Sequence, residues 1–179
     1  GSTSHAPGGV FQTNPSRMMC KFAQYTVDLL RSLSYEGKPA YHTVGGIEVS
    51  KTKERHEDLY RKLGIAHSYG LTDAKIISPD EVLKMSPYID PDKIHGGYYV
   101  PTDGLAAPVR AVQAMAKYVT DLNAGEFIGN TPVTGFKVSN NQVRGVETPK
   151  GDYEADIVLV STGIWAPKMG RLANISLPL

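Results

Sequence analysis

Apolar residues recur with a helical period near the start of the chain. Asn14 is a suitable helix cap, and Pro15 suits a first helical position because its missing N–H needs no partner there. The apolar residues that follow at helical spacing are Met18, Phe22, Tyr25, Leu29 and Leu33. The pattern predicts a helix that buries this face and is ended by Gly37-Lys38-Pro39.

An extended pattern and a charged helical pattern come next. Residues 41–50 form one predicted strand, in which the Gly45-Gly46 pair indicates a bulge or a close backbone approach. Residues 53–63 have the spacing of a charged helix. His56 and His67 lie on or after its polar surface, so both are predicted to be solvated.

The middle of the chain continues with short elements. A short strand is expected around Ile76-Ile77, and the Ser78–Glu81 segment has the pattern of a capping box that starts a helix. Residues 96–100 are a predicted strand, and residues 101–104 are its turn. A helix is then predicted from Pro108 to about Leu122. One face of this helix carries Val112, Met115, Ala116 and Val119.

Three strands are predicted in the last third of the chain. Residues 133–138 lead through an Asn140-Asn141 turn to residues 143–148, and a turn over residues 149–152 leads to a strand from Tyr153. Consecutive strands with short turns indicate an antiparallel meander.

The segment after the meander is an apolar run that follows Asp156. Residues 156–160 have the composition of a strand buried on both faces of a parallel sheet. Small residues follow in Ser161-Thr162-Gly163, where a ligand can approach the carboxyl end of the strand. The predicted fold class is therefore α/β with an antiparallel portion.

Composition and charge exclude several classes of protein. The 179 residues suffice for a sizeable core, and 41% hydrophobic with 21% charged residues is an ordinary globular balance. A net charge of +1 gives no reason to expect nucleic acid or an anionic membrane as partner. Apolar runs of only a few residues predict no membrane span. We also expect no metal site, because no His, Asp and Glu residues have ligand spacing.

The single cysteine and the two ends complete this picture. Cys20 rules out an internal disulfide, fits a reducing compartment, and is predicted to pack in the core. Gly1-Ser2 is consistent with a cloning scar, and the last residues, 175–179, are apolar. We therefore expect the chain to be an internal piece of a larger protein.

Five segments of the chain carry a family resemblance. They are GSTSHAPGGVFQTNP, VGGIEVS, GGYYVPTDGL, TPVTGF and VLVSTGIWAP, in this order. Over nearly its whole length the chain resembles the dimethylglycine oxidases, dimethylglycine dehydrogenases and sarcosine dehydrogenases. These are FAD-dependent flavoproteins of the D-amino-acid-oxidase type.

The resemblance implies a two-domain architecture. Residues 1–40 would belong to the FAD-binding domain, and residues 41–104 to a substrate domain with an antiparallel sheet over the flavin. Residues 105–179 would return to the FAD-binding domain and include the three-stranded meander.

The resemblance also implies a set of cofactor contacts. His5 matches the histidine that is joined through a ring nitrogen to the 8α-methyl carbon of FAD, and a neutral imidazole is a competent nucleophile. Val133 matches a position whose backbone meets the adenine, and Thr162-Gly163 matches a turn near the phosphates. The matched positions around the flavin are Ser2, Thr3, Ser4 and Gly9.

Other conspicuous side chains receive structural interpretations. Trp165 is expected in the core rather than in the flavin pocket, and Asp103 is expected to be a turn residue. Tyr98 and Tyr99 alternate across a strand, so one should face the core and the other solvent or a pocket.

The family's reaction gives the functional hypothesis. An N-methyl amino acid such as dimethylglycine or sarcosine would give a hydride to flavin, and the methyl carbon would leave as formaldehyde or pass to tetrahydrofolate in a separate domain. The GxGxxG turn that holds FAD pyrophosphate is absent from this sequence, and the family's catalytic tyrosine is expected outside it. No catalytic residue is therefore assigned. We expect a cytoplasmic protein whose isolated chain is inactive, holds little flavin, and needs the remaining segments of its parent.

Two alternatives remain open at the level of sequence. A related flavoenzyme could act on glycerol 3-phosphate or a D-amino acid. The chain or its parent could instead be a binding module that kept the fold and lost the cofactor.

Overall fold

The computed structural model describes residues 2–177. The chain divides into two compact units, residues 1–126 and residues 127–179. Gly1 of the Gly1-Ser2 pair and residues 178–179 of the apolar carboxyl-terminal segment lie outside the described residues. No helix within residues 2–177 is long and apolar enough to cross a membrane.

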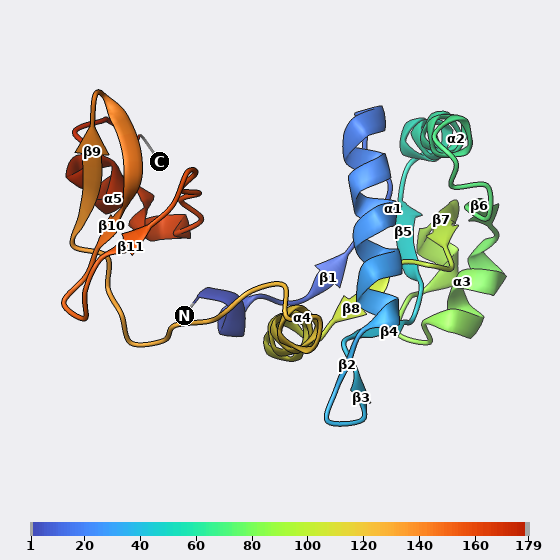
Figure 1. Cartoon of the computed structure of the whole chain (residues 1–179). Helices are drawn as coiled ribbons and strands as arrows, with labels where there is room; N and C mark the ends of the chain where they lie inside the picture. The colour runs from blue at the N-terminus through green and yellow to red at the C-terminus, as the bar shows by residue number, and fades with distance from the viewer. Residues whose placement is uncertain (1, 178–179) are drawn as a thin grey trace. The chain divides into compact units, whose positions relative to one another are not determined.

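The first unit combines four α-helices with three small antiparallel sheets in its described residues (Figure 1). The helices are α1 (Arg17–Ser32), α2 (Lys53–Ser68), α3 (Pro79–Met85) and α4 (Pro108–Asp121), with 3-10 turns η1 (Ser2–His5) and η2 (Pro91–Lys93). The strands are β1 (Gly9–Val10), β2 (Ser34–Tyr35), β3 (Lys38–Pro39), β4 (Tyr41–Thr43), β5 (Gly46–Ser50), β6 (Lys75–Ile77), β7 (Gly96–Val100) and β8 (Gly104–Ala106). Their orders are β1-β8-β4, β2-β3 and β5-β7-β6.

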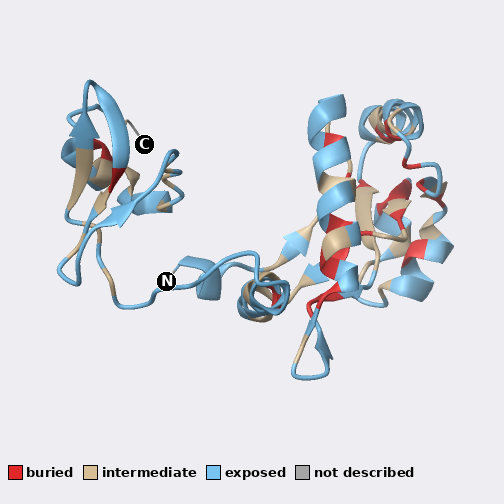
Figure 2. Cartoon of the chain, in the orientation of Figure 1, coloured by how far each residue is buried: buried red, intermediate tan, exposed pale blue. Residues whose placement is uncertain are grey.

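The β5-β7-β6 sheet is covered on both faces. On one face, Tyr98 and Val100 of β7 pack with Cys20 of α1 and Leu59 of α2. On the other face, α3 and the segment before β7 pack against the sheet, with Val82 at the centre. Figure 2 shows buried residues where the helices meet the strands. The prediction that Cys20 packs in the core is confirmed, because its side chain is fully buried.

A second cluster joins α1 to α4. Val27 and Leu30 of α1 pack with Tyr41 of β4 and with Ala111 and Ala114 of α4. The buried residues of α4 are thus its alanines, and their small size lets α4 approach α1 closely. The predicted apolar face was wrong in part, because Val112 and Met115 are exposed on the neighbouring face.

The first long helix differs from its prediction at its start and in its buried face. Ser16, not Asn14, is the cap: its Oγ accepts from the Met19 N–H at 3.5 Å, while Asn14 Oδ1 accepts from the Ser16 N–H at 3.0 Å. Met18, Phe22 and Tyr25 are exposed, with Phe22 at 58%. The helix turns its Cys20 and Val27 side to the neighbouring elements, and of the predicted face only Leu29 and Leu33 pack in the core.

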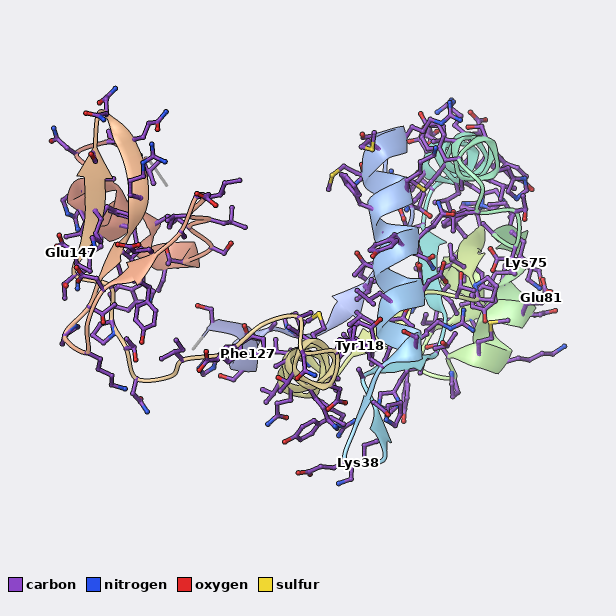
Figure 3. All side chains as sticks on the ribbon, viewed as in Figure 1. Lys38, Lys75, Glu81, Tyr118, Phe127 and Glu147 are labelled. Carbon is purple, nitrogen blue, oxygen red and sulfur yellow. The ribbon has the colours of Figure 1, made fainter. Side chains whose placement is uncertain are left out.

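The end of α1 also comes earlier than predicted. The helix stops at Ser32, and the chain enters the β2–β3 hairpin instead of continuing to Gly37. Glu36 and Gly37 form the turn with φ values of 51° and 71°, a left-handed pair that suits a tight hairpin. Lys38 lies close to this turn (Figure 3).

The predicted single strand over residues 41–50 is two strands in different sheets. β4 pairs with β8, whereas β5 pairs with β7. Gly45 lies between them with φ +77°, and its N–H donates to the Asp103 carbonyl oxygen at 2.8 Å. The glycine pair therefore marks a change of sheet rather than a bulge within one strand.

Local start and stop signals predicted the short elements well. Ser78 Oγ accepts from the Glu81 N–H at 3.3 Å, and Glu81 Oε2 accepts from the Ser78 N–H at 2.8 Å, so the capping box that starts α3 is confirmed. Glu81 is labelled in Figure 3. β6, β7 and the start of α4 at Pro108 also agree with prediction. The helix predicted over residues 53–63 continues to Ser68.

The second unit contains the predicted meander. Strands β9 (Gly135–Ser139), β10 (Gln142–Glu147) and β11 (Tyr153–Glu154) form an antiparallel sheet in the order β11-β10-β9. Asn140 and Asn141 make its first turn with φ values of 52° and 59°. The 3-10 turn η3 (Gly163–Trp165) and helix α5 (Ala166–Leu172) follow.

The predicted buried strand over residues 156–160 was wrong for this structure. No strand forms there, and Ile157 and Leu159 are each 85% exposed. A strand buried on both faces needs neighbouring strands and covering layers, and residues 2–177 place none beside it. Trp165 is likewise exposed, which corrects its expected place in the core.

Candidate functional site

The eight predicted cofactor residues lie in three places. Ser2, Thr3, Ser4 and His5 form η1, and Gly9 begins β1, so these five are neighbours in the first unit. Val133 precedes β9, and Thr162-Gly163 begins η3; both belong to the second unit. These placements leave the predicted contacts and the domain boundaries at residues 40 and 104 as predictions.

The amino-terminal turn presents its histidine to solvent. The Ala6 N–H donates to the Thr3 carbonyl oxygen at 3.2 Å and closes the turn. His5 is exposed at its end. The turn lies against α4 (Figure 1). An imidazole held on a short, closed turn of small residues is accessible to the edge of a planar ligand.

Gly8 is a structural requirement that the sequence pattern did not indicate. Its φ is +83°, and a Cβ there would lie 2.2 Å from the Ala106 carbonyl oxygen. The Ala106 N–H donates to the Gly8 carbonyl oxygen at 2.8 Å. At Gly9 a Cβ would lie 3.4 Å from Phe11, an ordinary contact. Of the Gly8-Gly9 pair, only the first position therefore demands glycine.

The Thr162-Gly163 turn contains an unsatisfied hydroxyl. Thr162 Oγ1 is buried and has no hydrogen-bond partner among the described residues. Gly163 follows with φ +52° and open space around its Cα. A buried polar group without a partner costs about 1–3 kcal/mol. The turn therefore holds a buried hydroxyl whose partner is not among residues 2–177.

A separate cavity of about 420 Å³ lies in the first unit. Residues of α2, β5, β7 and the loops beside them form its walls. The lining residues are Phe11, Thr13, Gly46, Ile47, Glu48, Lys62, Tyr98 and Asp103. None of them was among the predicted site residues.

Asp103 is the most buried charged group of this cavity. It is only 3% exposed, which corrects its assignment as a simple turn residue. Its Oδ1 accepts from the Gln12 N–H at 2.9 Å and from Gln12 Nε2 at 3.1 Å. Burial raises the pKa of Asp103, although the two bonds from Gln12 oppose the shift. The Pro-Thr-Asp-Gly turn was the only sequence signal, and it gave no indication of this partner.

Glu48 and Lys62 form the charged wall of the cavity. Lys62 Nζ donates a hydrogen bond to Glu48 Oε2, and Arg55 Nη2 lies 2.5 Å from Glu48 Oε1. Burial acts to raise the pKa of Glu48, but the hydrogen bonds and charges of Lys62 and Arg55 prevail and lower it. Lys62 Nζ also lies 5.0 Å from the centre of the Tyr98 ring.

Tyr98 closes the cavity from the sheet side. Its hydroxyl lies 2.7 Å from Thr13 Oγ1, and burial is the main cause of its raised pKa. Tyr98 and Tyr99 do point to opposite faces of β7, as predicted: Tyr98 faces the cavity and Tyr99 packs on the α3 side.

His56 has a structural partner that the sequence did not indicate. Its Nδ1 lies 2.9 Å from Oγ of the fully buried Ser50, whose hydroxyl is also 3.2 Å from the Gly96 carbonyl oxygen. A Cβ at Gly96 would lie 2.8 Å from His56 Cε1. The prediction of a merely solvated His56 was therefore wrong. Within residues 2–177, no three His, Cys, Asp or Glu side chains gather as metal ligands.

Sequence comparison defines the class of protein. The family described as FAD dependent oxidoreductase matches residues 1–179. This chain belongs to that family.

Individual relatives narrow the comparison. The chain is 29% identical to human mitochondrial sarcosine dehydrogenase and 28% identical to rat mitochondrial dimethylglycine dehydrogenase, in each case over 100% of the chain. It is also 29% identical to the mitochondrial pyruvate dehydrogenase phosphatase regulatory subunit of mouse. The chain spans only 20% of the sarcosine dehydrogenase and 21% of the other two.

A solved structure shows the same fold. The L-proline dehydrogenase from P. horikoshii matches 99% of this chain with a TM-score of 0.86 and 25% sequence identity. The chain covers 47% of that protein. The predicted fold, part of a D-amino-acid-oxidase-type flavoprotein, is confirmed.

Proposed function

We propose that the whole protein oxidises N-methylated amino acids such as sarcosine or dimethylglycine, with FAD joined covalently to His5. The observation that carries the proposal is the similarity of the entire chain to sarcosine and dimethylglycine dehydrogenases. The accessible His5 on its turn of small residues agrees with it. FAD, when bound, supplies the hydride acceptor.

The residues of this chain would anchor and orient the cofactor. His5 would anchor the flavin through a covalent link from one of its ring nitrogens to the 8α-methyl carbon, and the η1 turn of Ser2, Thr3 and Ser4 would hold the imidazole in place. Gly8 and Gly9 keep the following backbone free of side chains. In the second unit, the backbone at Val133 would meet the adenine.

The Thr162 hydroxyl fits a phosphate contact. Its buried Oγ1 lacks an acceptor in the described residues. Donation to a phosphate oxygen would give it a partner, and Gly163 beside it carries no side chain. These residues therefore fit the cofactor that the family uses.

The remaining segments of the parent protein are the proposed partners of the exposed apolar surface. Phe22 and Tyr25 of α1 and Tyr118 of α4 are exposed (Tyr118 is labelled in Figure 3). Residues 157–160 are apolar and are not paired in a strand. Covering such surface is favourable by about 25 cal/mol per Å². A tetrahydrofolate domain elsewhere in the parent and a place in one-carbon metabolism belong to the same proposal.

Peptide mass spectrometry of the parent protein tests the flavin link. We expect an FAD-sized adduct on the peptide containing His5 and its loss in the His5→Ala variant. His42→Ala is a matched control, because His42 is also exposed and should leave the adduct unchanged. Covalent flavin that persists in His5→Ala would refute the assignment. Turnover of sarcosine and dimethylglycine, against glycerol 3-phosphate and a D-amino acid, tests the substrate.

A non-catalytic role is the second candidate, and the similarity to a phosphatase regulatory subunit favours it. A parent protein with no flavin and no turnover of these four substrates would support this role. The named mammalian relatives are mitochondrial, and a cytoplasmic location for this protein remains a prediction that fractionation of the source cells can test.

A further inference from the structure

We propose that the cavity between β5, β7 and α2 binds a small zwitterionic amino acid, its ammonium group at Asp103 and its carboxylate at Lys62. The proposal uses none of the residues assigned to FAD. It rests on the amino-acid substrate proposed above, but its binding test does not depend on the flavin link.

Asp103 supplies a buried carboxylate with one open oxygen. Gln12 donates twice to Oδ1, whereas Oδ2 accepts no hydrogen bond from residues 2–177. Asp103 also forms no ion pair within those residues. Oδ2 lies 2.8 Å from the point where a Cβ of residue 46 would stand, so glycine there leaves the oxygen uncovered. A buried carboxylate in this state is stabilised by a cation that reaches it.

Lys62 supplies the opposite charge at the other wall. Glu48 accepts from both Lys62 and Arg55, so its single charge is shared between two cations. Arg55 also approaches Asp58 at 3.8 Å. An ammonium group has three donors, and Glu48 engages one from Lys62. Lys62 can therefore donate a hydrogen bond to a ligand carboxylate while it keeps its hydrogen bond to Glu48.

The two charges together select the ligand. A ligand with only a positive charge would be attracted by Asp103 but repelled by Lys62. A ligand with only a negative charge would be attracted by Lys62 but repelled by Asp103. A molecule that carries both charges can place its ammonium group at Asp103 and its carboxylate at Lys62. The rings of Phe11 and Tyr98 give apolar surface for aliphatic or N-methyl groups. The cavity volume of about 420 Å³ suits a small ligand.

Calorimetric titration of the chain with dimethylglycine tests this site. We expect saturable binding with a Kd below about 10 mM. Dimethylammonium chloride and sodium acetate each carry one of the two charges and should bind at least about tenfold more weakly. Saturable dimethylglycine binding with this preference supports the site. Absence of dimethylglycine binding, or equal binding of either half-ligand, overturns it.

Two variants locate the binding. Lys62→Met and Asp103→Asn should each weaken dimethylglycine binding about tenfold or more. Lys75→Met is the matched control, because Lys75 Nζ lies 5.8 Å from the Tyr99 ring, away from this cavity. Lys75→Met should bind as the unchanged chain does. Unchanged binding in Lys62→Met would overturn the proposal, and this comparison decides even if Asp103→Asn fails to fold.

Discussion

Single residues in this chain act through partners far away in sequence. Asp103 holds Gln12, which lies 91 positions earlier, and Tyr41 donates to the Thr102 carbonyl oxygen at 2.9 Å. Gly8 and Gly104 let strands β1, β4 and β8 approach closely. These residues fix the crossing of the amino-terminal loop over the β8 turn, which also bounds the proposed amino-acid cavity.

The titration of Tyr41 gives a prediction at this scale. Burial, together with the charge of Asp103 and against that of Arg31, raises the pKa of Tyr41 from 10.0 to about 12. The unfolded chain therefore loses this proton first as the pH rises. The contribution of Tyr41 to the free energy of unfolding is therefore complete below pH 10.0 and is lost progressively as the pH rises towards 12.

Urea unfolding at pH 9 and near pH 11.5 measures the effect. The free energy of unfolding should fall between these two pH values, and the Tyr41→Phe variant should show a smaller fall. Tyr88→Phe is a control, because Tyr88 is almost fully exposed. An identical pH dependence in the original chain and Tyr41→Phe would contradict the prediction.

At the scale of elements, strand pairing depends on backbone contacts that leave no room for a side chain. A Cβ at Gly104 would lie 2.1 Å from the His42 carbonyl oxygen, inside the β4–β8 pair. Gly64 is a glycine within α2, and a Cβ there meets nothing within 4 Å.

These two glycines predict opposite results for the same substitution. Gly104→Ala should destabilise the first unit by about 2 kcal/mol or more, because one strand must shift. Gly64→Ala should stabilise it by about 0.5–1 kcal/mol, since alanine has the better helix propensity. Thermal unfolding followed by circular dichroism compares them. Equal midpoints for the two variants would show that the β4–β8 contact is not restrictive.

At the scale of the whole molecule, the chain taken alone exposes more apolar surface than its own elements cover. Met18, Phe22 and Tyr25 present an apolar face on α1, and residues 156–160 expose another apolar stretch. Since the chain spans 20% of its sarcosine dehydrogenase relative, we propose that other segments of the parent cover both.

The same substitution in two contexts tests this proposal. Phe22→Ser should change the stability of the 179-residue chain by less than about 0.5 kcal/mol, because the side chain is 58% exposed. In the parent protein it should cost about 2 kcal/mol or more if the ring is buried there. Denaturant unfolding of both proteins gives the comparison. Equal small effects would mean that the face stays open in the parent.

The sequence by itself determined the features that depend on neighbouring residues. The capping box at Ser78–Glu81, the start of α4 at Pro108 and the Asn140-Asn141 turn follow from local hydrogen bonds and backbone preferences. The ordered series of family segments was likewise sufficient to identify an FAD-dependent oxidoreductase.

Only the tertiary structure decided which apolar surfaces are buried and which polar groups meet. Helical spacing gave both faces of α1 an apolar character, and contact with α2, β4 and α4 selected the Cys20 and Val27 side. The chain changes sheet at Gly45, and Asp103 is buried against Gln12. These outcomes depend on residues distant in sequence, so no local pattern could specify them.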